Sequence, residues 1–393
     1  MRSADLSSIK MIERLIGFDT TSRLSNLALI EWVKAYLAEH GVESRLSFDA
    51  DGKKANLFAT IGPADRPGIV LSGHTDVVPV DGQPWDSDPF TATERDGKLY
   101  GRGTSDMKSF IAVALALVPE FKRRALAKPI HLAFTYDEEV GCFGVRRLIE
   151  DLQAQGIKPE ACIIGEPTGM QVVTGHKGKL SVRCNVRGLE SHSSLTHRGV
   201  NAVEAAAEAV AFLKGMARDR RDNGPFNPQF EPPYTTVHTG VITGGTALNI
   251  VPRDCFFHFE FRFIPNDDPH AMLGQLQHFC AHTLEPEMHA VDGATGFKFE
   301  PSAGLPGLAT DEEAEITTLA KAAANANASA KVPFGTEGGF YHRAGIPTVI
   351  CGPGSIEQAH KPNEFISLEQ VALCERFMRR LMDRVCIPET TGA

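Results

Sequence analysis

The chain has 393 residues, enough for two or three domains, and its 42% apolar and 23% charged residues are typical of a globular protein, not a disordered or fibrous one. Its 49 acidic residues against 40 basic ones give a formal net charge of −9. Such a surface repels phosphate backbones and anionic lipids, so we expect neither nucleic acid nor a membrane as a main partner.

The N-terminal segment and the cysteines indicate a cytoplasmic protein. The first residues are polar, and no signal-peptide core follows them through Phe18. The longest apolar stretch, Phe110 to Pro119, is far shorter than the ~20 residues of a membrane-spanning helix and predicts a buried core helix. The eight cysteines include no C-x-x-C pair and lie mostly among apolar residues, which favours free thiols in a reducing cytosol.

The first part of the chain reads as alternating helices and buried strands. Helical spacing of apolar residues runs from Leu6 to His40, with a break near residues 19–22. Short apolar runs at residues 68–71, 130–134 and 161–164, bounded by Gly or Pro, predict strands of a mixed α/β sheet. Because ligands of open α/β sheets gather at the carboxyl ends of strands, we expect the polar residues after these runs to meet in one crevice. They are His74, Asp76, Asp137, Glu138, Glu139 and Glu166.

A second kind of pattern begins near Lys179. Apolar and polar residues alternate over 180–186 and 257–263, which predicts half-exposed antiparallel strands, with an Ala-rich helix over 201–216 between them. The Gly/Pro-rich run 293–307 predicts a linker, after which helices over 311–324 and 368–385 flank an apolar run at 347–351. We therefore predict a larger α/β domain, residues 1–178 and 294–393, into which a smaller α+β domain, residues 179–293, is inserted.

The larger domain carries the ligand types of a two-metal centre. Zinc takes His nitrogen and carboxylate oxygen, and two zinc ions ~3.5–4 Å apart need a bridging carboxylate. Five ligands suffice: one His and one terminal carboxylate per metal, and one shared Asp. Three carboxylates against two divalent cations leave a net positive charge, which favours hydroxide over water near neutral pH. The candidates are His74, Asp106, the acidic run 137–139, Glu166 and His360.

Each motif alone also has a simpler interpretation. Asp106 precedes an apolar helical pattern and suits a helix N-cap. Glu138 and Glu139 form a pair that is common on solvated surfaces, although at a strand end one can bind metal while its neighbour stays free as a general base. Gly101-x-Gly103 lacks the third glycine of a dinucleotide-binding loop.

Together, the motifs H-x-D, G-R-G-x-x-D-M-K, D-E-E, G-E-P, S-H-S and G-P-G-S-x-x-x-A-H resemble the M20 family of metallopeptidases and deacylases over essentially the whole chain. The resemblance implies a zinc-hydrolase catalytic domain with an inserted dimerisation or lid domain. It implies that Glu138 is the general base, that Asp76 supports His74, and that a cis peptide follows Asp106. The implied metal ligands are His74 and Glu166 for one ion, Glu139 and His360 for the other, and Asp106 as the bridge.

The resemblance also implies roles for residues outside the metal centre. His192, in S-H-S, matches a histidine that reaches the partner's active site in dimers and helps to stabilise the oxyanion. Asn249 and Arg262 match positions that grip the substrate carboxylate. Residues 352–364 and 334–337 look most like the acetylornithine deacetylase branch, in which an acidic Glu337 could receive the substrate's δ-ammonium.

We therefore predict a cytoplasmic homodimeric amidohydrolase with two Zn²⁺ ions per subunit, for which Co²⁺ or Mn²⁺ could substitute. Its small-molecule substrate would be an N-acyl amino acid, foremost N-acetyl-ornithine, cleaved to ornithine and acetate in arginine biosynthesis. The alternatives with the same metal residues are a succinyl-diaminopimelate desuccinylase, an aminoacylase and a dipeptidase. A non-catalytic binding protein is the alternative of another class.

Overall fold

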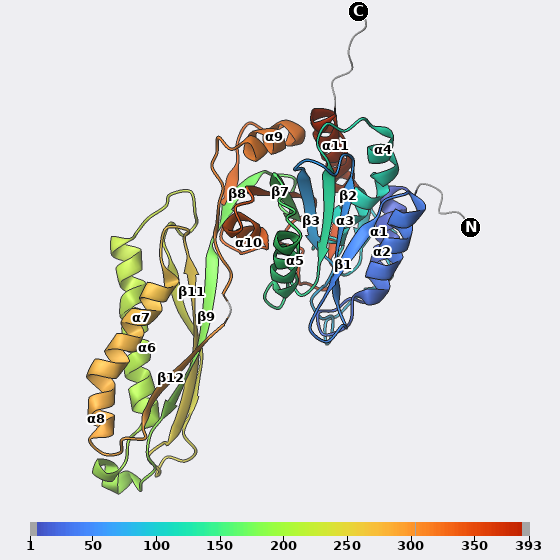
Figure 1. Ribbon diagram of the computed structural model, residues 1–393. Helices are drawn as coiled ribbons and strands as arrows, with labels where there is room; N and C mark the ends of the chain where they lie inside the picture. The colour runs from blue at the N-terminus through green and yellow to red at the C-terminus, as the bar shows by residue number, and fades with distance from the viewer. Residues whose placement is uncertain (1–5, 303, 387–393) are drawn as a thin grey trace, which may run out of the picture. The chain divides into compact units, whose positions relative to one another are not determined.

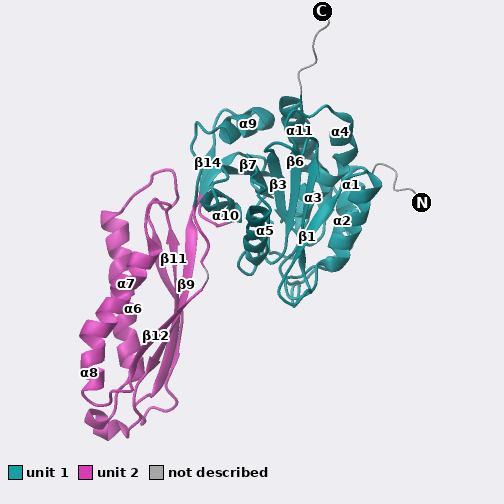
Figure 2. Ribbon diagram, in the orientation of Figure 1, with its two compact units in different colours: residues 1–175, 308–331, 336–393 teal, residues 176–307, 332–335 magenta. Residues whose placement is uncertain are grey.

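The structure is a computed structural model that describes residues 6–302 and 304–386. The chain divides into two compact units: unit 1 comprises residues 1–175, 308–331 and 336–393, and unit 2 comprises residues 176–307 and 332–335 (Figure 2). Unit 2 extends past residue 293, where the sequence analysis ended the inserted domain. The predicted linker is wrong here because β12 (Gly296–Pro301) pairs with β9 (Gly178–Arg187) and packs Phe297 and Phe299 against the core of unit 2.

Unit 1 is built on a nine-stranded mixed sheet in the order β1-β2-β6-β3-β7-β15-β8-β13, with β14 paired to β8 (Figure 1). The central strands β6, β3, β7 and β15 pair in parallel and are buried at every position, which explains their continuous apolar sequences. A small second sheet has the order β16-β5-β4. The strands are β1 (Ser44–Phe48), β2 (Ala55–Ile61), β3 (Ile69–His74), β4 (Thr93–Arg95), β5 (Lys98–Tyr100), β6 (Ile130–Thr135), β7 (Ala161–Pro167), β8 (Val173–His176), β13 (Leu308–Ala309), β14 (Ala330–Val332), β15 (Thr348–Gly352) and β16 (Phe365–Ser367).

Helices cover both faces of the large sheet. Leu71 of β3 belongs to the main hydrophobic core, which it shares with Phe110 of α3 and Phe377 of α11. Its neighbour Ser72 points the other way, because successive strand residues alternate, and its hydroxyl lies 3.1 Å from the Tyr341 hydroxyl of α10. The helices of unit 1 are α1 (Ser8–Ile16), α2 (Leu27–Glu39), α3 (Lys108–Ala116), α4 (Val118–Arg123), α5 (Phe143–Ala154), α9 (Glu315–Ala324), α10 (Gly338–Arg343) and α11 (Leu368–Val385).

Unit 2 is an antiparallel four-stranded sheet with helices on one face. The sheet has the order β10-β11-β9-β12, with β10 (Thr236–Gly244) and β11 (Asp254–Phe263) joining the strands already given. The predicted alternation is confirmed: Val182, Phe257 and Phe259 are buried in the unit's own core, under α6 (Ala202–Asn223) and α7 (Pro269–Phe279). Helix α7 continues through a π-helical turn (Cys280–Leu284) into α8 (Glu285–His289).

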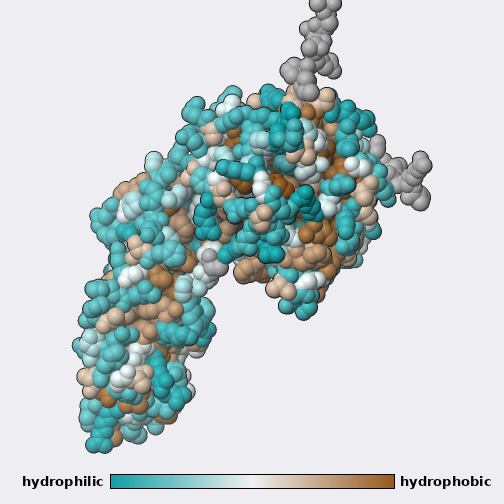
Figure 3. All heavy atoms as spheres, in the orientation of Figure 1, coloured by the Kyte–Doolittle hydropathy of each residue, from teal (hydrophilic) through white to brown (hydrophobic). Residues whose placement is uncertain are grey.

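Most predicted helices lie where the sequence indicated. The break near residues 19–22 separates α1 from α2, and the apolar stretch at 110–119 is buried in α3 and α4. Helix α9 begins at Glu315, not Asp311, because the Asp311 carboxylate accepts the Glu313 N–H in a preceding turn. The face drawn in Figure 3 is largely hydrophilic. Among the described residues, no helix combines the length and apolar character needed to cross a membrane.

Candidate active site

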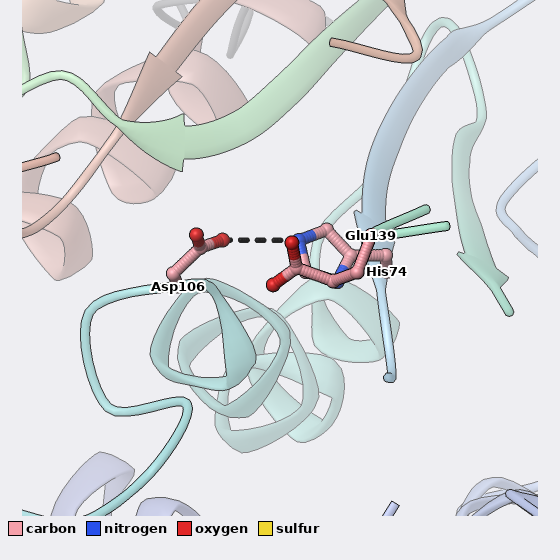
Figure 4. Close-up of side chains that lie close together, drawn as sticks. All are labelled: His74, Asp106 and Glu139. Carbon is pink, nitrogen blue, oxygen red and sulfur yellow. Dashed lines mark hydrogen bonds and ion pairs between the residues drawn. The ribbon is translucent and has the colours of Figure 1, made fainter. Parts of the chain in front are cut away.

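The residues grouped as metal ligands come together in unit 1, at the carboxyl ends of adjacent strands. His74 ends β3, Glu166 lies near the end of β7, and the acidic run 137–139 directly follows β6. Strands β6, β3 and β7 are neighbours in the sheet. Asp106 comes from the loop before α3, and His360 from the loop after β15. In Figure 4, the side chains of His74, Asp106 and Glu139 turn toward one another.

Asp106 lies between two histidines, one at each carboxylate oxygen. Its Oδ1 is 3.0 Å from His74 Nε2, and its Oδ2 is 3.5 Å from His360 Nε2. Each histidine also faces a second carboxylate: Glu166 Oε1 is 3.7 Å from His74 Nε2, and Glu139 Oε2 is 3.0 Å from His360 Nε2. The result is two imidazole–carboxylate pairs that share one aspartate. The Asp106–Met107 peptide bond is cis.

The electrostatics of this cluster favour positive charge at its centre. Hydrogen bonds to Asp106 and Glu139 raise the pKa of His360 to about 10. Burial opposes the charged form of His74, yet contacts with Asp106 and Asp76 hold its pKa well above the usual value. Burial also raises the pKa of Glu166, and the negative charge of Asp106 adds to this effect. The carboxylates therefore stabilise cations placed among them.

The donor set fits divalent metal ions. Ligand atoms of His74, Asp106 and Glu139 lie within 4.8 Å of one another, as do those of His74, Glu138 and Glu166. Imidazole nitrogen and carboxylate oxygen suit Zn²⁺, and also Co²⁺ or Mn²⁺. His74 Nδ1 lies 2.9 Å from the main-chain oxygen of Asp76, and a hydrogen bond there leaves the Nε2 lone pair for a metal.

Asp76 supports the cluster by a route that the sequence did not indicate. Its Oδ1 is 3.6 Å from His74 Nδ1, so its main-chain oxygen, not its carboxylate, makes the short contact with the imidazole. The buried carboxylate accepts hydrogen bonds from the main-chain N–H groups of Glu138, at 3.0 Å, and Glu139, at 3.3 Å. Asp76 therefore also holds the backbone of the acidic run.

Glu138 differs from its neighbour Glu139 in its contacts. Its Oε1 accepts a weak hydrogen bond from the Cys142 thiol at 3.5 Å, and among the described residues its carboxylate forms no histidine ion pair like that of Glu139. Burial raises the pKa of Glu138 well above its usual value, and the negative charges of Glu139 and Glu337 add to this. A carboxylate with a raised pKa holds an accepted proton more firmly than an ordinary carboxylate does.

Two charged residues that the sequence analysis gave no role hold the loop that carries Asp106. Arg102 and Glu364 are each 1% exposed and form an ion pair of 2.7 Å. The Glu364 carboxylate also accepts the main-chain N–H groups of Gly103, Ser105 and Asp106 at 2.8–3.0 Å. The sequence signal was a basic residue in the motif G-R-G-x-x-D-M-K and an acidic residue at the end of the run 352–364. Only the fold reveals that these two residues pair.

Glu337 is buried beside this cluster. It is 1% exposed, and neither carboxylate oxygen has a hydrogen-bond partner among the described residues. Burial raises the pKa of its carboxyl to about 7. Its negative charge in turn raises the pKa of Glu138. Glu337 thus lies close enough to Glu138 for the two charges to interact.

The three predicted functional residues of unit 2 lie at two separate places. His192 and Asn249 are exposed and adjacent, since the chain forms a bridge between His192 and Ile250, and Ser193 N–H donates to the Asn249 carbonyl. Arg262 lies near the far end of β11, where its Nε donates to Glu260 at 2.9 Å. Ile250, the partner of His192, precedes Asp254 at the start of β11. The eight residue steps from Asp254 to Arg262 span roughly 26 Å of strand. One copy of unit 2 therefore does not bring Arg262 to His192.

Comparisons with known sequences agree with these motifs. The family model for peptidase family M20/M25/M40 matches residues 70–384. The acetylornithine deacetylase of Pasteurella multocida is 33% identical over 97% of this chain and 98% of its own length. The acetylornithine deacetylase of Proteus mirabilis is 34% identical over 94% of this chain and 93% of its own.

Solved structures share the fold at lower identity. The aminopeptidase PepT of Bacillus cereus has a TM-score of 0.76 at 20% identity and covers 97% of this chain and 100% of its own. The M20 metallo-carboxypeptidase of Sulfolobus solfataricus has a TM-score of 0.75 at 19% identity, with 96% and 98% covered. A dinuclear metal-binding peptidase of the M20 family from Bacillus subtilis has a TM-score of 0.66 at 15% identity, with 96% and 98% covered.

Proposed function

This chain belongs to peptidase family M20/M25/M40, and we propose that it is a dinuclear zinc enzyme that removes the acetyl group from N-acetyl-ornithine. Metal-dependent amide hydrolysis is the activity of its class. The observation that carries the proposal is the placement of Asp106 between His74 and His360, each of which faces a second carboxylate. Zinc is the metal we propose, with cobalt or manganese as substitutes in such an O/N site.

The metal ligands in this proposal are His74 and Glu166, Glu139 and His360, and the shared Asp106. Two bound zinc ions would supply a Lewis acid and a hydroxide source near neutral pH. Glu138 takes the proton of the attacking water and returns it to the departing amine, which its raised pKa supports. His192 donates a hydrogen bond to the developing oxyanion, a contribution of about 2.7–4 kcal/mol for a preorganised donor.

N-acetyl-ornithine is the substrate that the relatives support, since those at 33–34% identity over nearly the whole chain are acetylornithine deacetylases. Arg262 and Asn249 would bind the α-carboxylate, for which a guanidinium offers two parallel donors. Glu337 would bind the δ-ammonium. A buried carboxylate without a hydrogen-bond partner gains most from such a cation, which supports this role.

We also propose a homodimer, which the positions of these residues support. If His192 and Arg262 serve one bound amino acid, they come from two chains, because β11 separates them within one copy of unit 2. The edge strand β10 and the loop after it expose apolar side chains, among them Ile242 and the fully exposed Leu248. Exposed apolar side chains on an edge strand and in the loop beside it support a self-association surface.

The cysteines support a cytoplasmic location. All eight are free thiols, and seven of them are buried. Scattered unpaired thiols are typical of proteins that work in a reducing compartment. There the product ornithine would enter arginine biosynthesis.

Initial rates of the zinc-loaded protein test the proposal. N-acetyl-ornithine is compared with N-succinyl-diaminopimelate, N-acetyl-methionine and a dipeptide, each with a chelator-treated control. A chelator-sensitive preference for N-acetyl-ornithine is expected. Preference for another member of the panel would refute this substrate and leave the metal centre standing, whereas a metal-replete protein inert on a wide acyl-amino acid panel would favour a binding protein.

A further inference from the structure

Hydrogen bonds join the segment before α2 to the residues that directly follow β3, the strand that ends at His74. Ser22 N–H donates to the Val77 carbonyl at 3.1 Å, and Val77 N–H donates to the Thr20 carbonyl at 3.2 Å. The Thr20 hydroxyl donates to the Thr75 carbonyl at 2.6 Å. These bonds fix Ser22, which is buried, beside the residues that immediately follow His74.

From this position the Ser22 hydroxyl reaches the Asp76 carboxylate. Ser22 Oγ donates to Asp76 Oδ2 at 2.7 Å, a short charge-assisted hydrogen bond. The same carboxylate accepts the N–H groups of Glu138 and Glu139. Three donors therefore share one buried carboxylate, and two of them belong to the backbone of the acidic run.

The other end of the acidic run is tied to the same segment. The Lys54 ammonium group donates both to the Ser22 carbonyl and to the Asp137 carboxylate. Asp137 adopts a left-handed conformation, with φ of 56°, which turns the two N–H groups that follow it toward Asp76. Backbone in this conformation persists only where its surroundings hold it.

We propose that Ser22 is a positioning residue of the hydrolytic site. Its hydroxyl holds the Asp76 carboxylate in the one orientation that binds both amides, and so sets the general base Glu138 and the metal ligand Glu139 against Asp106. Without this hydroxyl the Asp76 carboxylate is free to rotate toward His74 Nδ1, 3.6 Å away, and the acidic run loses its anchor. This inference rests on the roles proposed above for Glu138 and Glu139.

The test compares Ser22→Ala with Ser22→Thr, which keeps the hydroxyl, and with Ser25→Ala as the matched control. Ser25 lies in the same segment, is exposed, and bonds the Lys53 carbonyl instead of the site. Loss of a group that orients metal ligands typically costs 10–100-fold in activity or metal affinity. We expect Ser22→Ala to lower kcat by roughly this factor with KM unchanged, and to release metal to a competing chelator at lower concentration. Ser22→Thr recovers most of both, and Ser25→Ala matches the wild type.

Wild-type kcat and chelator competition in Ser22→Ala would overturn the inference. So would equal losses in Ser22→Thr, which would assign the effect to packing, or in Ser25→Ala, which would assign it to the segment as a whole. Glu138→Gln, assayed in parallel, separates this inference from the proposed function. Full turnover in Glu138→Gln refutes the role of Glu138 as general base. An inactive Glu138→Gln together with an unaffected Ser22→Ala refutes only the role of Ser22.

Discussion

Replacing Glu364 with alanine should strongly destabilise unit 1. The change leaves the Arg102 guanidinium, 1% exposed, without its ion-pair partner and removes the acceptor of three main-chain N–H groups. Breaking a buried pair by removing one partner costs about 3–5 kcal/mol, because an uncompensated charge stays buried. Each main-chain N–H group left without an acceptor would add about 1–3 kcal/mol to this loss of stability unless water reaches it. We therefore expect the free energy of unfolding to fall by at least about 3 kcal/mol.

Urea unfolding of the metal-free protein measures this effect. Both tryptophans, Trp32 and Trp85, belong to unit 1, so their fluorescence follows the unfolding of that unit. The matched control is Glu160→Ala, which removes a partly exposed ion pair with Lys128 and should cost less than about 1 kcal/mol. Equal unfolding free energies for Glu364→Ala and Glu160→Ala would refute the reasoning.

Three further predictions concern pH, substrate binding and thiols. Burial lowers the pKa of His131 to about 4. As the pH falls, the His131 imidazole is therefore protonated in the unfolded chain before it is protonated in the folded one. The free energy of unfolding therefore falls between pH 6.5 and 4, by up to about 3 kcal/mol. Urea unfolding of the metal-free protein at pH 7 and at pH 4.5 should show a smaller fall for His131→Gln than for the wild type, and equal falls would contradict this. Arg262→Ala should raise KM and spare kcat, and an unchanged KM removes it from carboxylate binding. A mild thiol reagent should leave activity intact, since all cysteines but Cys386 are buried; rapid inactivation would contradict this.

The sequence predicts best those features that are local. Continuous apolar runs mark the parallel strands β3, β6 and β7 because both faces of a central parallel strand are buried. Polar residues placed directly after such runs then meet at one edge, as His74 and the acidic run 137–139 do. The gathering of the ligand types could therefore be predicted from their positions along the chain.

Features that depend on distant partners could not be predicted in this way. Strand β12 is short, begins with Gly296 and ends with Pro301, and it becomes a strand through pairing with β9, far away in the sequence. Likewise, the acceptor for the Asp106 loop is Glu364, and the donor to Asp76 is Ser22, each remote along the chain. A single sequence shows hydrogen-bonding residue types but not which of them meet.

The central claim is that Asp106 is shared by two metal ions while Glu138 only moves a proton. Metal content per chain, measured for Asp106→Ala and Glu138→Gln after zinc loading and alongside turnover, tests it most directly. We predict that Glu138→Gln keeps the wild-type metal content and loses nearly all turnover, whereas Asp106→Ala loses metal as well. An Asp106→Ala variant with wild-type metal content and full turnover would contradict the account.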